Sequence, residues 1–220
     1  MSQKSAFLEG EGDQWFQRNP LNLTTLSTDI FNHRVANYVR ESSRVLEIGC
    51  ADGRRLYAIK QLARGLGTFT GVDPSREAIK NGAETFPSLR LQLGTSDDTG
   101  LNESFDLVLL GFCMYLCDRN LLIQSVAECD RMLDDNGILA ILDFEAPFPA
   151  RRRYSHLQGL WSYKMDYSRL FLASPAYSLL EVVRQQISEP EGHSSLDSRF
   201  DNLSLTILKK SLGAGYVDLA

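Results

Sequence analysis

Strands and helices alternate five times between Arg44 and Asp143, and this alternation constrains the fold more than any other feature of the sequence. The predicted strands are short apolar runs over residues 44–48, 68–73, 89–93, 105–110 and 138–142. Amphipathic helical patterns separate them, as over Arg54–Leu66 and Arg119–Leu133. Such alternation is typical of a parallel sheet with helices on both faces. The sequence therefore predicts an α/β, doubly wound fold.

The segments on either side of this core have other patterns. An acidic, glycine-rich stretch, Glu9–Asn19, precedes a predicted helix over Leu26–Arg40. Two strand patterns, 179–187 and 203–209, close the chain and bring the mostly parallel sheet to seven strands. Residues 144–176 hold three prolines and three successive arginines, which suits an insertion after the fifth strand. We expect a single domain over 1–220, made of an N-terminal lid or helix (1–40), the core (44–143) and this insertion (144–176).

Composition and charge argue against several classes of protein, namely nucleic-acid-binding, membrane-spanning and metal-binding proteins. The net charge of -5, from 23 Lys+Arg against 28 Asp+Glu, predicts no broad attraction to nucleic acid. The sequence has no run of about eighteen apolar residues and no basic start followed by an apolar run, so we expect a cytoplasmic protein without a membrane segment. The four cysteines (Cys50, Cys113, Cys117 and Cys129) lack the spacing of metal ligands, which predicts free thiols and no metal site.

The strongest functional signal lies between the first predicted strand and the following helix, where the sequence reads Glu47-Ile-Gly-Cys-Ala-Asp-Gly53. Glycines in such a loop let the backbone approach a ligand, and in open α/β sheets ligands bind beyond the carboxyl ends of the strands. A dinucleotide loop fits badly, because its second and third glycines fall on Ala51 and Arg54. A P-loop is excluded as well, because no Gly-Lys-Ser/Thr follows.

This loop resembles the first motif of the Rossmann-like S-adenosylmethionine-dependent methyltransferases, acidic-x-Gly-x-Gly-x-Gly, with Ala51 in place of the middle glycine. Three further family features follow in order: Asp73 after the second strand, Gly94–Asp98 after the third, and Phe105–Phe112 along the fourth. Thr95 stands where the family usually has an acidic residue, so Ser96 or Asp97 would take its place. The resemblance covers about residues 44–143 and concerns the cofactor.

The resemblance implies S-adenosyl-L-methionine as the cofactor and assigns its contacts. The loop would line the methionine portion, and the two oxygens of Asp73 would accept hydrogen bonds from the ribose hydroxyls. An alternative for Asp73 is a cap on the helix that begins at Pro74. The predicted cofactor contacts are Glu47, Gly49, Cys50, Ala51, Gly53, Asp73, Pro74, Ser96, Asp97, Gly111 and Phe112.

The acceptor is less well specified. Glu9–Asn19 and Gly111–Arg119 look like segments of methyltransferases associated with bacterial surface-sugar and nonulosonate pathways, a resemblance that is weaker than that of the core. It implies a small-molecule acceptor, such as a sugar or sugar-nucleotide of surface polysaccharide biosynthesis.

Methyl transfer from a sulfonium is an in-line displacement, so orientation carries most of the catalysis, and a hydroxyl acceptor benefits from a base. The candidate catalytic residues are His156, Asp143 and Glu145, and the candidate substrate contacts are Arg152, Tyr154 and Tyr163. His156 as a surface residue and Arg151–Arg153 as a solvated loop are the alternatives. A non-catalytic S-adenosylmethionine-binding protein is the rival function, followed by a nicotinamide-dependent oxidoreductase. The sequence leaves open the methylated atom (O, N or C) and the oligomeric state.

Overall fold

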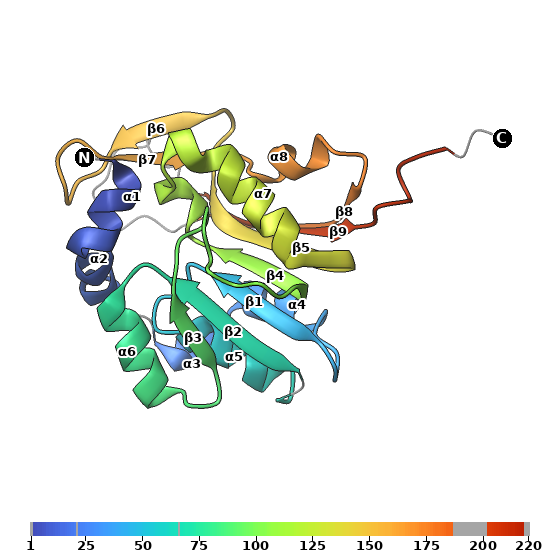
Figure 1. Ribbon diagram of the computed structural model, residues 1–220, viewed down its shortest axis with the longest axis horizontal. Coiled ribbons are helices and arrows are strands. Elements are labelled where there is room, and N and C mark those ends of the chain that lie inside the picture. The colour runs from blue at the N-terminus through green and yellow to red at the C-terminus, as the bar shows by residue number, and fades with distance from the viewer. Residues whose placement is uncertain (1, 21, 66, 187–201, 218–220) are drawn as a thin grey trace.

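A seven-stranded sheet forms the centre of the protein in a computed structural model that describes residues 2–20, 22–65, 67–186 and 202–217 (Figure 1). The strand order is β3-β2-β1-β4-β5-β9-β8. The strands are β1 (Arg44–Ile48), β2 (Thr68–Asp73), β3 (Arg90–Leu93), β4 (Phe105–Gly111), β5 (Leu133–Glu145), β8 (Tyr177–Gln186) and β9 (Asn202–Lys210). The first five pair in parallel, and β9 runs antiparallel to both β5 and β8. The predicted doubly wound fold is confirmed.

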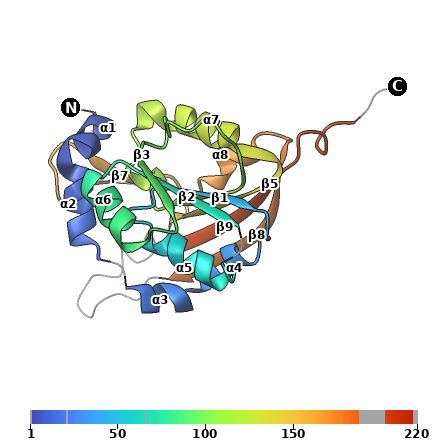
Figure 2. The same cartoon turned by 60° about the horizontal axis from the view of Figure 1, so that its bottom comes forward.

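Helices cover both faces of this sheet (Figure 2). On one face lie α3 (Leu23–Thr28), α4 (Ile30–Ala36) and α5 (Arg54–Leu62), which bury Phe31, Leu56 and Ile59 against it. On the other lie α7 (Leu122–Met132) and α8 (Ser168–Leu172), which bury Met132 and Phe171. Because helices cover both faces, the central part of β4 is an apolar run, Leu107–Leu110, whose residues are at most 1% exposed.

The prediction of a single helix over Leu26–Arg40 is wrong, because the chain forms two helices there. Asp29 lies between α3 and α4 with extended backbone angles. Its side chain accepts a hydrogen bond from the backbone N–H of Phe31 at 2.8 Å and so caps α4. A capping aspartate thus interrupts the apolar period and lets α4 change direction.

The N-terminal segment (residues 3–18) is helical. It consists of α1 (Gln3–Ala6), the π-helical turn η1 (Phe7–Glu11) and α2 (Gly12–Arg18), with a kink at Gly10, whose φ is 145°. Glycine tolerates this φ value, which residues with a side chain rarely adopt. The helix α2 of this segment packs against α6 (Arg76–Thr85). The segment was predicted only as part of an N-terminal lid or helix over residues 1–40.

The insertion after β5 forms a hairpin of β6 (Ala150–Arg153) and β7 (Trp161–Lys164), followed by α8. The hairpin lies beside the N-terminal segment (Figure 1), and the amide of Gln3 donates to the carbonyl of Trp161 at 2.8 Å. The closing strands predicted at 179–187 and 203–209 correspond to β8 and β9, apart from Ile187, which lies outside the described residues. Within the described ranges, no helix has the length and apolarity needed to cross a membrane.

Candidate functional site

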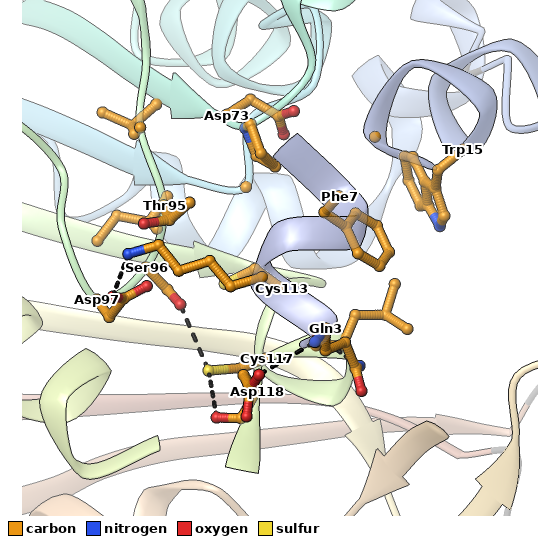
Figure 3. A pocket seen from close by; sticks show the side chains of 18 of the residues that line it. Gln3, Phe7, Trp15, Asp73, Thr95, Ser96, Asp97, Cys113, Cys117 and Asp118 are labelled. Carbon is orange, nitrogen blue, oxygen red and sulfur yellow. Dashed lines mark hydrogen bonds and ion pairs between the residues drawn. The ribbon is translucent and has the colours of Figure 1, made fainter. Parts of the chain in front are cut away.

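A pocket opens at the carboxyl ends of β1, β2 and β4, with the N-terminal segment as its outer wall (Figure 3). Its empty volume is about 770 Å³, part of which is open solvent. The lining residues are Gln3, Lys4, Phe7, Gly12, Trp15, Ile48, Gly49, Val72, Asp73, Pro74, Gly94, Thr95, Ser96, Asp97, Phe112, Cys113, Leu116, Cys117 and Asp118.

The loop after β1 turns sharply through three left-handed residues. Gly49, Ala51 and Gly53 have φ values of 82°, 49° and 79°. A β-carbon on Gly49 would lie 2.7 Å from that of Cys113, so the glycine permits close contact between this loop and the end of β4. Ala51 keeps its left-handed conformation because its N–H donates to Asp73 Oδ2 at 2.8 Å. At Gly53, Leu89 and Leu91 occupy the space beside the missing side chain, so this glycine serves packing.

Asp73 lies at the end of β2 and holds two backbone groups. Its Oδ2 binds the N–H of Ala51, and its Oδ1 accepts from the N–H of Ser75 at 2.9 Å. The cap of α6 is Ser75, whose hydroxyl accepts from the N–H of Ala78 at 3.0 Å. Desolvation raises the pKa of Asp73 to about 6, although the two N–H donors oppose the shift. Each carboxylate oxygen has a second lone pair, so Asp73 can still accept ligand hydroxyls.

At the other end of the pocket, Asp97 is 7% exposed and forms an ion pair from its Oδ2 to Lys4 Nζ at 2.6 Å (Figure 3). Nearby, the backbone N–H of Gln3 donates to Asp118 Oδ2 at 3.1 Å. The Ser96 hydroxyl lies 2.9 Å from that of Ser125. The N-terminal segment therefore supplies a cation and an N–H group to two carboxylates of the pocket wall.

Glu47 is 1% exposed and lies beneath the loop rather than in the pocket wall. Its Oε1 is 3.7 Å from Arg55 Nε, whereas Oε2 has no hydrogen-bond partner in the described part of the chain. Burial raises the pKa of Glu47 to about 8, against the effect of Arg55. The Arg55 guanidinium also lies over the ring of Phe112, 5.2 Å from its centroid. Glu47 and Arg55 thus support the pocket residue Phe112, which has a φ of 52°.

The structure separates the eleven predicted cofactor contacts into two groups. Gly49, Asp73, Pro74, Ser96, Asp97 and Phe112 line the pocket. Glu47, Cys50, Ala51, Gly53 and Gly111 support the loop from behind and do not line it. Contact of each residue with the cofactor remains a prediction.

The residues predicted for catalysis have other partners. Asp143 is buried and accepts from the backbone N–H groups of Tyr115 and Phe144 at 3.2 and 2.7 Å, and desolvation raises its pKa to about 7. Glu145 binds Arg184 through both oxygens, at 2.6 and 2.9 Å. His156 is exposed, with its ring edge against Tyr154, and it does not line the pocket. The structure therefore brings none of the three side chains to the pocket wall.

The residues predicted for the substrate lie on the hairpin. Arg152 is exposed, and Tyr163 packs its ring under the Arg119 guanidinium at 4.3 Å. Tyr154 donates its hydroxyl to Glu11 Oε1 at 2.7 Å and accepts from Arg18 Nη2 at 3.1 Å. Glu11 and Arg18 also form an ion pair. We call Glu11, Arg18 and Tyr154 the latch, because they join the N-terminal segment to the hairpin.

The predicted cofactor contacts include none of the five lining residues of the N-terminal segment, which are Gln3, Lys4, Phe7, Gly12 and Trp15. The glycines at positions 10 and 12 hid the helical period of this segment. The only signal was the resemblance of Glu9–Asn19 to other methyltransferases, which includes Gly12 and Trp15 but not the first three residues.

The strand order, the glycine turn after β1 and the carboxylate after β2 define the class of S-adenosylmethionine-dependent methyltransferases with a Rossmann-like fold. Residues 45–137 match the family described as "Methyltransferase domain". Residues 45–137 thus match a methyltransferase domain, and S-adenosylmethionine is the cofactor of this class.

Solved structures share this fold. An S-adenosylmethionine-dependent methyltransferase from Methanosarcina mazei is 16% identical, with a TM-score of 0.62 over 81% of this chain and 97% of that one. The 1,6-didemethyltoxoflavin-N1-methyltransferase of Burkholderia thailandensis, with S-adenosylhomocysteine bound, is 14% identical, with a TM-score of 0.66 over 94% of this chain and 87% of that one. The N-methyltransferase NodS of Bradyrhizobium japonicum, also with S-adenosylhomocysteine, is 19% identical, with a TM-score of 0.60 over 90% of this chain and 97% of that one.

Among curated proteins, a chain of Invertebrate iridescent virus 6 that is named as a methyltransferase (235L) is 25% identical over 76 residues. That match spans 34% of this chain and 28% of the viral relative.

The described residues fit the cofactor of this class. The pocket presents Asp73 to ligand hydroxyls and Asp97 to a hydrogen-bond donor, with the crowded turn at Gly49 between the strand ends. The orphaned Glu47 Oε2 below the loop leaves one acceptor for a water or an amino group.

Proposed function

We propose that this protein transfers a methyl group from S-adenosylmethionine to the amino group of a small molecule, with an amino sugar or its nucleotide as the acceptor class. One observation carries the methyl-transfer part. Asp73, Asp97 and the Gly49 turn line the same pocket, where they would bind the ribose, the base and the methionine chain of the cofactor.

The chemistry of the pocket wall supports an amine. Bound cofactor supplies a methyl group on a sulfonium, and the protein must align the acceptor with it and exclude water. The described lining contains no histidine, and its three carboxylates, Asp73, Asp97 and Asp118, already accept hydrogen bonds from the protein. An uncharged amine has a free lone pair and needs little help from a base, whereas a hydroxyl needs one.

The acceptor side lies next to the latch. Phe7 lines the pocket, and its ring is 6.2 Å from that of Tyr154. Trp15 also lines the pocket and donates its indole N–H to the Tyr115 hydroxyl at 3.1 Å. Burial, and then the hydrogen bond to Glu11, raise the pKa of Tyr154, so this hydroxyl stays protonated. We therefore place the acceptor against Trp15, Tyr115 and the latch.

The arginines of the hairpin support a nucleotide-linked acceptor. Arg151 and Arg153 lie over the Trp161 ring, at 4.2 and 5.9 Å from its centroid. Arginine binds phosphate through planar, bidentate hydrogen bonds, and aromatic rings stack on bases. Two of the solved relatives named above are N-methyltransferases, which agrees with an amine acceptor.

Calorimetry tests the cofactor assignment first. S-adenosylhomocysteine should bind with micromolar affinity, equivalent to about -8 kcal/mol, whereas NADH should not bind. If NADH binds and S-adenosylhomocysteine does not, the result would favour a nicotinamide-dependent oxidoreductase instead. Binding of the cofactor with no transfer to any metabolite fraction would instead support a non-catalytic binding protein.

Radiolabelled S-adenosylmethionine tests the acceptor class. Nucleotide-linked amino sugars should accept label, and their N-acetylated counterparts should not, because acetylation delocalises the nitrogen lone pair into the amide. Arg151→Ala should raise KM for a nucleotide-linked acceptor more than for the free amino sugar. Equal labelling of both forms would identify a hydroxyl as the nucleophile.

A further inference from the structure

The Lys4–Asp97 ion pair joins two parts of the chain that are far apart in sequence. Lys4 lies in α1 of the N-terminal segment, whereas Asp97 lies in the loop that follows β3. Both line the pocket, and their charged atoms are 2.6 Å apart. The Asp97 side chain is 5% exposed, so this is a largely buried carboxylate paired with one cation. Such a pair fixes the carboxylate more firmly than a surface pair would.

Neighbouring contacts hold both partners in place. The Gln3 amide donates to the carbonyls of Leu116 and Trp161, at 2.6 and 2.8 Å, and thereby anchors the start of α1. On the other side, Gln124 Nε2 donates to the carbonyl of Asp97 at 3.3 Å. Hydrogen bonds therefore hold both the helix α1, which carries Lys4, and the loop that carries Asp97.

The two oxygens of Asp97 differ in their contacts. Oδ2 is occupied by Lys4, whereas Oδ1 accepts no hydrogen bond from any described residue. A carboxylate oxygen accepts hydrogen bonds, so this free oxygen is available to a donor on the ligand. An exocyclic amino group on a base is such a donor, and a 6-oxo group is not, because it brings a second acceptor against the first.

We propose that Lys4 is a positioning residue for base recognition: it orients Asp97 so that Oδ1 accepts a hydrogen bond from the 6-amino group of the cofactor's adenine. This inference rests on the proposed function, because it requires S-adenosylmethionine in the pocket. It also makes the base subsite dependent on the N-terminal segment. The protein would then discriminate fully between a 6-amino and a 6-oxo base only when α1 lies over the pocket.

The test compares S-adenosylhomocysteine with S-inosylhomocysteine, whose base carries a 6-oxo group, by calorimetry. The wild-type protein should prefer the adenosyl compound by about 10- to 100-fold, as expected for a charge-assisted hydrogen bond. Lys4→Met should reduce this preference to a few-fold, and Lys4→Arg should restore most of it. Asp97→Asn should abolish it, because the amide can donate to a 6-oxo group as well as accept from an amino group. Lys80→Met, an exposed lysine on α6, is the matched control.

The possible failures are distinguishable. If neither compound binds the wild-type protein, the proposed function fails. If both bind it equally, or if Lys4→Met keeps the wild-type ratio, the inference alone is overturned. An equal loss of affinity for both compounds in Lys4→Met would reduce Lys4 to a structural contact. Tighter binding of both would mean that Lys4 occupies cofactor space.

Discussion

At the scale of single residues, a substitution can separate the structural role of Asp73 from the cofactor contact that we predict for it. Asp73 ties Ala51 and Ser75 into the pocket wall and has lone pairs left for the ribose hydroxyls. Asp73→Ala would leave two N–H groups unsatisfied, each at a cost of about 1–3 kcal/mol. Asp73→Asn keeps one acceptor oxygen and removes the charge. We expect it to weaken S-adenosylhomocysteine binding by about 10- to 100-fold, from the loss of about 1.5–3 kcal/mol in charged hydrogen bonds.

Calorimetry together with thermal melting checks this prediction. Glu84→Gln, on an exposed position of α6, controls for the lost charge. A normal affinity in Asp73→Asn, with a lower melting temperature, would show that Asp73 serves only the loop.

The sequence predicted those site residues whose position follows from a strand end. Asp73 and the Gly49 loop belong to the carboxyl ends of β2 and β1, and parallel strands bring such ends together. Lys4 and Trp15 reach the same pocket from the N-terminal segment, through contacts that no local pattern encodes. His156 failed to reach it for the same reason, since its place depends on how the hairpin packs.

At the scale of elements, β1 to β4 were predicted to within one residue at each end, whereas β5 (Leu133–Glu145) extends beyond the predicted residues 138–142. Buried strands such as β1 and β4 are apolar runs with clear ends, whereas the helix ends depend on single capping residues such as Asp29. The β6–β7 hairpin was not predicted, because its first strand is an arginine run with no apolar alternation. The arginines at 151 and 153 pack on Trp161 instead.

The latch gives a prediction at this scale. Tyr154→Phe removes the hydroxyl that binds Glu11 and Arg18, so the N-terminal segment should open more often from the hairpin. Hydrogen exchange of residues 3–18 should become several-fold faster, while the free energy of unfolding changes by about 1 kcal/mol. Tyr163→Phe, on the same hairpin, is the matched control, because no described residue forms a hydrogen bond with its hydroxyl. Unchanged exchange in Tyr154→Phe would show that other contacts hold the segment.

At the scale of the whole molecule, three buried carboxyl groups link folding to pH. Desolvation raises the pKa of Asp73, Asp143 and Glu47 to about 6, 7 and 8. Above the ordinary carboxyl pKa, the folded protein therefore binds more protons than the unfolded chain. The free energy of unfolding must then fall as the pH rises from about 5 to 8. Each group contributes at most about 1.4 kcal/mol per pH unit within its own range.

Glu47→Gln isolates one of these contributions. The variant cannot ionise, so its stability should fall less steeply with pH, and the difference from the wild-type protein should grow in the variant's favour up to pH 8. Denaturant unfolding at half-unit pH steps measures this difference, and the contributions of Asp73 and Asp143 cancel in it. Two forces compete at this site: desolvation favours the neutral acid, whereas Arg55, 3.7 Å away, favours the anion. Parallel curves would show that Arg55 prevails and that Glu47 is ionised throughout this range. Diverging curves would show that the methyltransferase domain keeps a protonated carboxyl group beneath its cofactor loop.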